Sequence, residues 1–176
     1  MRALVVYESM YGNTQAVAEA VADGLRHGTD IDTVEAVEVG AAPRDVERDV
    51  DLLVVGAPTH AFSLSRPNSR ADAAKRSDRP LVSTGIGIRE WIAGLPRTTA
   101  AGGVATFDTR LRRPRLPGSA ARAALRRMRR LGWRPAARAA SFWVEGTTGP
   151  LSDGELERAR RWGTELAAKT PAAREP

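Results

Sequence analysis

The residues best suited to chemistry form a short loop, Ser9-Met10-Tyr11-Gly12-Asn13-Thr14, between an apolar run and a helical pattern. Ser9 and Thr14 supply hydroxyl donors, and Gly12 lets the backbone close around a ligand. The amide groups that open a helix lack intrahelical partners and lie at the positive end of its dipole. Since the loop holds no lysine or arginine, we expect neutral donors to bind one phosphate monoester here. The alternative is an ordinary helix N-cap with a turn glycine.

Several other kinds of site are absent from the sequence. It has no G-x-x-x-x-G-K-[ST] motif, which excludes a P-loop NTPase. Gly85-Ile86-Gly87 is followed by Glu90 where a dinucleotide-binding motif needs its third glycine. The chain has no cysteine and only two histidines, His27 and His60, so we expect no disulfide, no thiolate nucleophile and no metal site.

Short apolar runs alternate with helical patterns along the chain, which is typical of an α/β fold with a parallel sheet. We expect strands at residues 2–7, 32–38, 51–56, 100–107 and 138–145. We expect helices at residues 14–27, 67–77, 87–95, 119–131 and 153–168. The loop at residues 9–14 then lies beyond the carboxyl end of the first strand, where open parallel sheets bind ligands.

The chain length and the order of the elements predict one domain over residues 1–169. Within it, residues 60–99 run longer than a plain crossover needs, so we expect an elaborated connection there. Residues 170–176 are expected to form a frayed C-terminal tail. No apolar run approaches the roughly 20 residues of a membrane span. Because the N-terminus also lacks a secretory signal pattern, we expect a cytoplasmic protein.

The basic residues are concentrated in one part of the chain. The formal net charge is +6, and 25 of the 27 basic residues are arginine. Residues 109–144 contain eleven arginines and no acidic residue, whereas the rest of the chain has 16 basic and 21 acidic residues. The helix expected at residues 119–131 carries five of these arginines opposite an apolar stripe. Such a region attracts nucleic acid, anionic lipid, phosphorylated ligands or acidic proteins.

Residues 5–21, VVYESMYGNTQAVAEAV, resemble the flavodoxin signature at its aliphatic, aromatic, Ser, Gly, Thr and Ala positions. The resemblance covers about residues 1–168, with a looser fit over residues 63–99. It implies a flavodoxin-like, doubly wound α/β fold, in which a five-stranded parallel sheet of order 2-1-3-4-5 has helices on both faces. It also implies that FMN binds beyond the carboxyl ends of the strands, with its phosphate in the loop at residues 9–14.

In the flavodoxin family, the loops after the third and fourth strands hold the flavin ring. The resemblance assigns these loops to Pro58-Thr59-His60-Ala61-Phe62 and Thr106-Phe107-Asp108-Thr109-Arg110. His60 falls where many flavodoxins carry an aromatic ring against the flavin, and Phe62 is a second candidate for that position. The alternative for His60 is an exposed loop residue, and the alternative for Phe62 is a core aromatic. The second segment lacks the tyrosine that usually stacks on the outer face of the flavin. The alternative to a flavin-binding role for Asp108-Thr109-Arg110 is a turn before a basic loop. We therefore expect weaker FMN binding, or a flavin covered by a partner or by residues 63–68.

Arg110, Arg112, Arg113 and Arg115 follow the fourth expected strand. Positive charge favours the reduced, anionic form of a flavin, and one charge at about 6 Å in an effective dielectric of about 20 is worth about 3 kcal/mol before solvent screening. We therefore expect the flavin to be easier to reduce here than in flavodoxins that are acidic around it. The alternative is a solvated loop without an electronic effect.

Together, these features predict an FMN-binding electron-transfer protein that cycles the flavin between redox states for partner proteins. No catalytic side chain is then needed, because the flavin does the chemistry. One alternative is a small FMN-dependent NAD(P)H:quinone-type oxidoreductase in which residues 63–99 line a substrate pocket, and another is a binding module without flavin. We expect a reductase and an acceptor protein as partners, acidic where they dock. Nucleic acid is not expected, because the arginines lack interleaved aromatics and a known binding motif.

Overall fold

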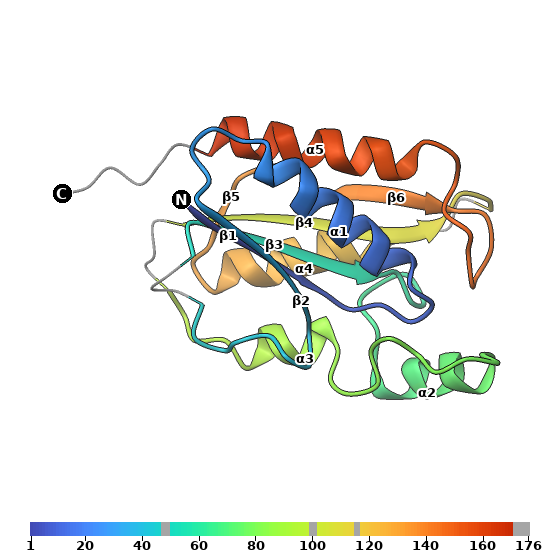
Figure 1. Ribbon diagram of the computed structural model, residues 1–176. Helices are drawn as coiled ribbons and strands as arrows, with labels where there is room; N and C mark the ends of the chain where they lie inside the picture. Colours follow the sequence, from blue (N-terminus) through green and yellow to red (C-terminus); the bar gives the residue numbers. More distant parts are fainter. Residues whose placement is uncertain (47–49, 99–101, 115–116, 171–176) are drawn as a thin grey trace.

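The computed structural model describes residues 1–46, 50–98, 102–114 and 117–170. Its centre is a parallel β-sheet in which the strands lie in the order β2-β1-β3-β4-β5. The strands are β1 (Arg2–Tyr7), β2 (Thr33–Glu38), β3 (Leu52–Pro58), β4 (Gly103–Leu111), β5 (Arg134–Pro135) and β6 (Ala140–Val144). The predicted parallel sheet of order 2-1-3-4-5 is confirmed (Figure 1). Residues 171–176 of the predicted tail lie outside the described residues.

The edge of the sheet differs from the single strand predicted at residues 138–145. Two strands share the position next to β4, because β5 pairs with the start of β4 and β6 pairs with its end. The pairing of β5 with β4 ends at Pro135, and pairing with β4 resumes at Ala140 in β6. The sheet formed by the described residues therefore has six strands rather than five.

The fourth strand continues beyond its predicted end at residue 107, and β4 reaches Leu111. Its last residues pair with Ala57 and Pro58 of β3 on one side and with β6 on the other. The segment Thr106–Arg110, predicted to be a loop, therefore lies within a strand. The sequence did not show this because the neighbours that extend the strand come from distant parts of the chain.

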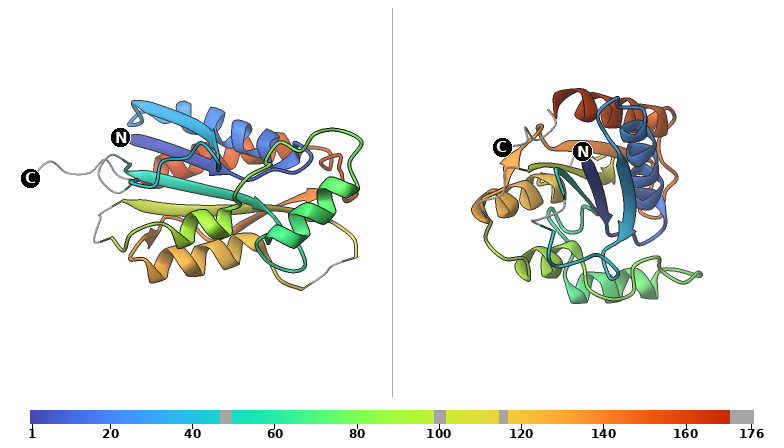
Figure 2. Two further views of the ribbon diagram at one scale, coloured as in Figure 1. Left: turned by 90° about the horizontal axis from the view of Figure 1, so that it is seen from below. Right: turned by 60° about the vertical axis from the view of Figure 1, so that its left-hand side comes forward.

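Helices cover both faces of the sheet, as predicted. One face carries α1 (Asn13–Arg26) and α5 (Glu155–Lys169), and the other carries α3 (Ile88–Ala93) and α4 (Ala120–Arg130) (Figures 1 and 2). The remaining helix, α2 (Pro67–Lys75), lies near the carboxyl ends of the strands (Figure 1). In the part of the chain that the structure describes, no helix is long and apolar enough to cross a membrane.

Alternate side chains of the central strands build a core on each face of the sheet. In β1, Leu4 and Val6 pack with the residues of α3 and α4, whereas Ala3 and Val5 pack with those of α1 and α5. The buried side chains of β3 follow the same alternation. Because helices cover both faces, these strands are continuous apolar runs in the sequence.

Glycines allow α1 and α5 to pack closely. A Cβ added at Gly24 would lie 1.9 Å from the carbonyl oxygen of Arg160, and one at Gly163 would lie 2.3 Å from the carbonyl oxygen of Val21. Both contacts are with backbone atoms, so a side chain at either position forces the two helices apart.

We expect Gly163→Ala to lower the free energy of unfolding by about 1–3 kcal/mol, because the added methyl group overpacks this interface. Urea unfolding measures the change. Gly85→Ala is the matched control, since its Cβ would meet no atom within 4 Å. Equal stabilities of the two variants would contradict the close packing of α1 and α5.

The connection predicted to be elaborated packs against the loop that follows β1. The backbone N–H groups of Val82 and Ser83 donate to the carbonyl oxygens of Met10 and Ser9, over 3.1 and 2.8 Å. The hydroxyl of Ser83 also accepts a hydrogen bond of 2.9 Å from the N–H of Ser9. These bonds fix the backbone of the loop just before α1 begins.

Candidate functional site

A cavity of about 320 Å³ opens at the carboxyl ends of β1, β3 and β4. Most of the predicted site residues line it: Ser9, Met10, Tyr11, Asn13, Thr14, Pro58, Thr59, His60, Ala61, Thr109 and Arg110. Some of them do not: Gly12, Phe62, Thr106, Phe107 and Asp108. Other residues complete the wall without having been predicted: Ser69, Asp72, Ala73, Arg76, Leu111, Val144 and Thr147. The described residues contain no group that could hold a metal ion.

The loop between β1 and α1 is closed by its own side chains. The Oγ of Ser9, a fully buried residue, accepts a hydrogen bond of 3.1 Å from the N–H of Gly12. Gly12 is the N-cap of α1 and has a φ of 88°, a left-handed conformation that favours glycine. The hydroxyl hydrogen of Ser9 has no acceptor among the described residues, so it remains available to a ligand.

The start of α1 presents unused hydrogen-bond donors. The backbone N–H groups of Tyr11, Asn13 and Thr14 have no acceptor within the described chain. Gly12 provides no side-chain cap, and the first turn of α1 contains no acidic residue. These donors line a cavity at the positive end of a helix dipole, and they therefore fit an anion such as a phosphate group.

Threonine hydroxyls join α1 to the end of β4. The Oγ1 atoms of Thr14 and Thr109 are 2.7 Å apart, and both residues are buried. Thr106 and Phe107, two residues predicted to contact a flavin, lie instead in the core. Thr106 donates a hydrogen bond of 3.0 Å to the carbonyl oxygen of Ala121 in α4. Of the segment Thr106–Arg110, the structure therefore brings only Thr109 and Arg110 to the cavity wall.

Asp108 is buried beside the cavity wall rather than in it. Its Oδ2 atom accepts hydrogen bonds from the hydroxyls of Ser119 and Thr59, over 2.5 and 3.0 Å. The same atom accepts a 3.0 Å bond from the N–H of Ala121 in the first turn of α4. Its Oδ1 atom has no hydrogen-bond partner among the described residues. Asp108 therefore fixes the position of Thr59, which lines the cavity, relative to the start of α4.

A tight turn follows the end of β3. The N–H of His60 donates to the carbonyl oxygen of Ser63 over 2.9 Å, and the reverse bond is 3.0 Å long. Ala61 and Phe62 lie between these two residues and have φ angles of 42° and 72°. Positive φ angles of this size are strained for residues other than glycine. The Phe62 side chain is 50% exposed, which excludes the core position considered for it.

His60 lines the cavity and is half-buried. Its Nδ1 atom lies 3.3 Å from the Oγ of Ser69 in α2. Burial, and then the positive charge of Arg70, lowers the pKa of His60. The His60 imidazole is therefore neutral at about pH 7, and it contributes a flat, uncharged ring to the wall of the cavity.

Helix α2 forms one wall of the cavity; the oxidoreductase alternative placed the segment 63–99 at a pocket, but it named no residue of this helix. The Tyr11 hydroxyl donates a hydrogen bond of 3.1 Å to the carbonyl oxygen of Ala73 and so holds α2 beside the loop. Asp72 and Arg76 complete this side of the cavity. The helix is polar and mostly exposed, so its sequence carries no periodic signal for the face that turns toward the site.

Two arginines reach the cavity, although the loop at residues 9–14 contains none. Arg76 follows α2, and Arg110 donates a hydrogen bond of 2.6 Å to the carbonyl oxygen of Gly118. Arg112, predicted to lie near a flavin, instead pairs with Glu145 over 3.6 Å and does not line the cavity. Arg113 is exposed and away from the wall, and Arg115 lies outside the described residues.

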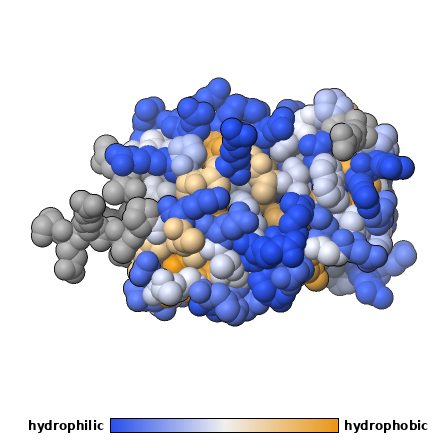
Figure 3. Space-filling view, turned by 90° about the horizontal axis from the view of Figure 1, so that it is seen from above, coloured by the Kyte–Doolittle hydropathy of each residue, from blue (hydrophilic) through white to orange (hydrophobic). Residues whose placement is uncertain are grey.

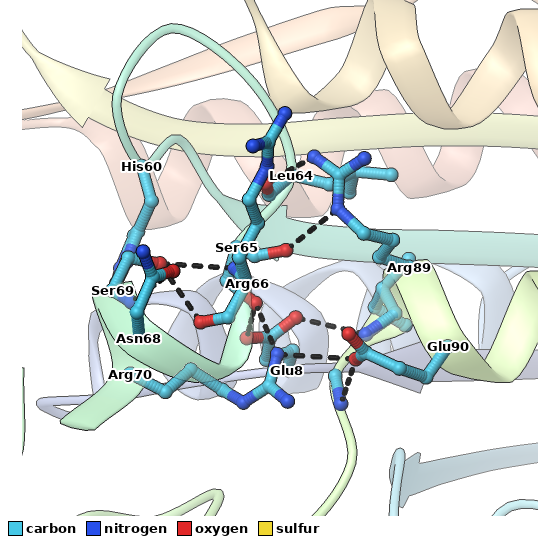
Figure 4. A network of polar contacts seen from close by, with 12 residues as sticks. Glu8, His60, Leu64, Ser65, Arg66, Asn68, Ser69, Arg70, Arg89 and Glu90 are labelled. Carbon is cyan, nitrogen blue, oxygen red and sulfur yellow. Dashed lines mark hydrogen bonds and ion pairs between the residues drawn. The ribbon is translucent and has the colours of Figure 1, made fainter.

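Glu8, the residue before the loop, is buried in a polar network (Figure 4). One of its carboxylate oxygens accepts a hydrogen bond from Ser65, and the other accepts a 2.8 Å bond from the N–H of Ile88. Arg70 donates to Ser65 over 2.9 Å and pairs with Glu90 over 3.1 Å. The network therefore fastens α2 and α3 to the end of β1. No role for Glu8 could be predicted from the sequence.

Burial raises the pKa of Glu8, so the folded state keeps a proton that the unfolded state loses above about pH 4.5. We therefore expect stability to fall as the pH rises from that value through the pKa of the folded state. Glu8→Gln cannot ionise, and its urea-unfolding free energy should vary less over this range. Glu19→Gln, at an exposed position, is the control and should keep the wild-type profile. Parallel profiles for wild type and Glu8→Gln would contradict this account.

Comparisons with known proteins agree with this architecture. The flavodoxin family model matches residues 5–76, which include the loop and α1. A flavodoxin from Streptococcus pneumoniae TIGR4 superposes with a TM-score of 0.67 at 20% identity, covering 96% of this chain and 99% of that one. Flavodoxin 1 from Bacillus cereus superposes with a TM-score of 0.66 at 16% identity, covering 96% of this chain and 98% of that one. A flavodoxin from the domain Archaea superposes with a TM-score of 0.63 at 21% identity, covering 97% of this chain and 99% of that one. No curated protein sequence matches the chain.

The sheet order and the superposition on solved flavodoxins show a flavodoxin-like fold, and the flavodoxin family model matches the part of it that holds the loop at the start of α1. The likeness extends along nearly the whole chain, because the solved flavodoxins superpose on more than nine-tenths of it.

Proposed function

We propose that this chain binds FMN in the cavity and transfers electrons between partner proteins. The observation that carries the proposal is the group of backbone donors without acceptors at the start of α1. Bound FMN would supply one-electron and two-electron transfer, and the protein would bind, orient and shield it.

The loop at residues 9–14 fits the phosphate of FMN. The N–H groups of Tyr11, Asn13 and Thr14 and the hydroxyl of Ser9 would donate hydrogen bonds to its oxygens. The dipole of α1 adds partial positive charge, and Arg76 adds a full charge at the cavity wall. This set has donors and positive charge but no carboxylate in the loop itself.

The remaining walls suit the flavin ring. The backbone of the segment 58–61 provides polar groups beside the neutral ring of His60. Leu111 and Val144 provide apolar surface, which a flat aromatic ligand needs for most of its contacts. Arg110 supplies a positive charge that favours the reduced flavin.

The test is to purify the protein without added flavin and then titrate the flavin-free form with FMN. We expect a flavin absorbance spectrum in the purified protein, and quenching of FMN fluorescence that saturates at one FMN per chain. A colourless protein that leaves the fluorescence of added FMN unchanged would favour a binding module without flavin.

The wall formed by α2 favours a second candidate function, a small FMN-dependent NAD(P)H:quinone-type oxidoreductase. Asp72 and Arg76 could contact a substrate held next to the flavin. Steady-state oxidation of NADPH by a quinone separates the two functions. Turnover without any other protein would favour the oxidoreductase, whereas retained FMN without turnover would favour the electron carrier.

A further inference from the structure

Helix α4 exposes a row of unpaired positive charges. Its five arginines are Arg122, Arg126, Arg127, Arg129 and Arg130. Within the part of the chain that the structure describes, none of them forms an ion pair. Arg122 and Arg126, like Arg126 and Arg130, are four residues apart and therefore repel one another along the helix.

The opposite face of the molecule differs in its charge pairing. On α5, Arg160 pairs with Asp23 and Glu157 over 2.6 and 2.7 Å, and Lys169 pairs with Glu165 over 3.7 Å. Figure 3 shows this face, where hydrophilic side chains surround small apolar areas. The arginine content of the chain therefore does not by itself explain the unpaired charges of α4.

Two further arginines join those of α4 from neighbouring elements. Arg89 of α3 donates hydrogen bonds of 2.8 and 2.6 Å to the carbonyl oxygens of Ser65 and Leu64, which hold its guanidinium in place (Figure 4). Burial, and then the positive charges of Arg127 and Arg66, lower the pKa of Arg89. Arg66, the N-cap of α2, and Arg127 of α4 are thus close enough to Arg89 of α3 for their charges to act on it. We call these residues the basic face: Arg66, Arg89, Arg122, Arg126, Arg127, Arg129 and Arg130.

The described acidic groups next to this face already have ion-pair or hydrogen-bond partners. Glu90 pairs with Arg70, and Glu8 is buried with Ser65 and the N–H of Ile88. The compensating negative charge must therefore come from another molecule or from solvent ions.

The basic face begins at the mouth of the cavity. The N–H of Ala120, the first residue of α4, donates a hydrogen bond of 3.0 Å to the Oγ1 of Thr59 in the cavity wall. Phe62 is half-exposed next to Gly118, where an added Cβ would lie 2.0 Å from the Phe62 carbonyl oxygen. Exposed aromatic and arginine side chains are the residue types that contribute most at protein interfaces.

We propose that the basic face docks an acidic protein that exchanges electrons with the flavin bound in the adjacent cavity. This inference rests on the proposed function. A protein lying over α4 and Phe62 would reach the cavity mouth, and charge complementarity would speed its association.

The observations favour a protein over nucleic acid or a membrane. The large exposed hydrophobic residues of the described chain are Phe62, Val82 and Leu156, so no aromatic side chain is interleaved with the arginines of α4 to stack on bases. The apolar residues of α4 that a bilayer would need, such as Met128, are buried against the sheet.

The test uses flavin-free protein and cytochrome b5, an acidic haem protein, as the probe, with binding measured by calorimetry at low and physiological salt. The test variant carries Arg126→Gln, Arg129→Gln and Arg130→Gln. The control variant carries Arg160→Gln, Arg161→Gln and Lys169→Gln on α5, which remove the same charge from the opposite face. A third variant carries Arg126→Lys, Arg129→Lys and Arg130→Lys, which keep the charge. Thermal unfolding verifies that all three variants are folded.

We expect the α4 glutamine variant to bind cytochrome b5 roughly tenfold more weakly, the α5 variant within about twofold of wild type, and the lysine variant close to wild type. Wild-type affinity should fall as salt increases. Equal losses on both helices, or no binding of cytochrome b5 by the wild type, would overturn the proposal. Tighter binding of a DNA duplex or of phosphatidylserine vesicles through the same three arginines would also overturn it.

Electron transfer from the FMN-loaded, reduced protein to cytochrome b5 separates this inference from the proposed function. Binding that depends on α4, without electron transfer, would support the docking face and contradict the proposed function. Electron transfer that is insensitive to the α4 variant would support the function and contradict the docking face.

Discussion

Asn13→Asp is expected to weaken FMN binding roughly a hundredfold. Asn13 is the first residue of α1 and lines the cavity among the unused backbone donors. A negative charge about 5 Å from a phosphate, in an effective dielectric of about 20, costs about 3 kcal/mol before solvent screening. Because the residue is half-buried, about 2.5 kcal/mol of this should remain, which corresponds to the expected loss. Fluorescence titration of the flavin-free protein measures it.

Unfolding does not account for this loss, because an acidic residue in the first turn of a helix stabilises the helix by about 0.3–1 kcal/mol. The matched control is Asn13→Ala. It also removes the 3.1 Å hydrogen bond from the Asn13 amide to the carbonyl oxygen of Thr148, but it adds no charge. FMN affinities that are equal in the two variants would contradict a phosphate site at the start of α1.

Asp108→Ala is expected to lower the free energy of unfolding by about 3 kcal/mol or more. The substitution leaves the Ser119 and Thr59 hydroxyls and the N–H of Ala121 without their acceptor. Two of these three donors belong to buried residues, so water does not fully replace the carboxylate. Urea unfolding of the flavin-free protein measures the change.

Asp78→Ala provides the control for Asp108→Ala, because Asp78 is exposed and has no hydrogen bond or ion pair with the described residues. Its stability should remain within about 0.5 kcal/mol of wild type. If Asp108→Ala changes the stability as little as this control does, then Asp108 does not hold the turn after β3 to α4.

Much of the fold follows from local patterns in the sequence. The apolar runs of β1 and β3 predict buried central strands, and the spacing of Val17, Val21 and Leu25 predicts the buried stripe of α1. The loop at residues 9–14 could also be predicted, since Ser, Gly and Thr lie directly between these two elements. A strand, a loop and a helix that are consecutive in the chain need no distant partner to be recognised.

The parts that could not be predicted depend on distant partners. β4 extends to Leu111 because β3 and β6 pair with its end, and neither pairing is visible in the local sequence. For the same reason, Asp108 was placed in a flavin loop although its bonds go to the start of α4. Helix α2 forms a wall of the cavity through contacts with distant residues, such as the hydrogen bond from Tyr11 to the carbonyl oxygen of Ala73.

The charge pattern is an intermediate case. The sequence showed that residues 109–144 are basic, but it could not show which arginines are neutralised. The structure pairs Arg112 with Glu145, whereas the described chain offers no ion pair to the arginines of α4. It also brings Arg89, from a separate part of the chain, within electrostatic reach of both Arg127 of α4 and Arg66.

The most direct test of the central claim compares two flavins that differ only in the phosphate group. Flavin-free protein is titrated with FMN and with riboflavin, for the wild type and for Asn13→Asp. If the loop at residues 9–14 binds the phosphate, then wild type should bind FMN roughly a hundredfold more tightly than riboflavin, and Asn13→Asp should abolish most of that difference. Equal affinities of the wild type for FMN and riboflavin would show that this loop does not bind the phosphate.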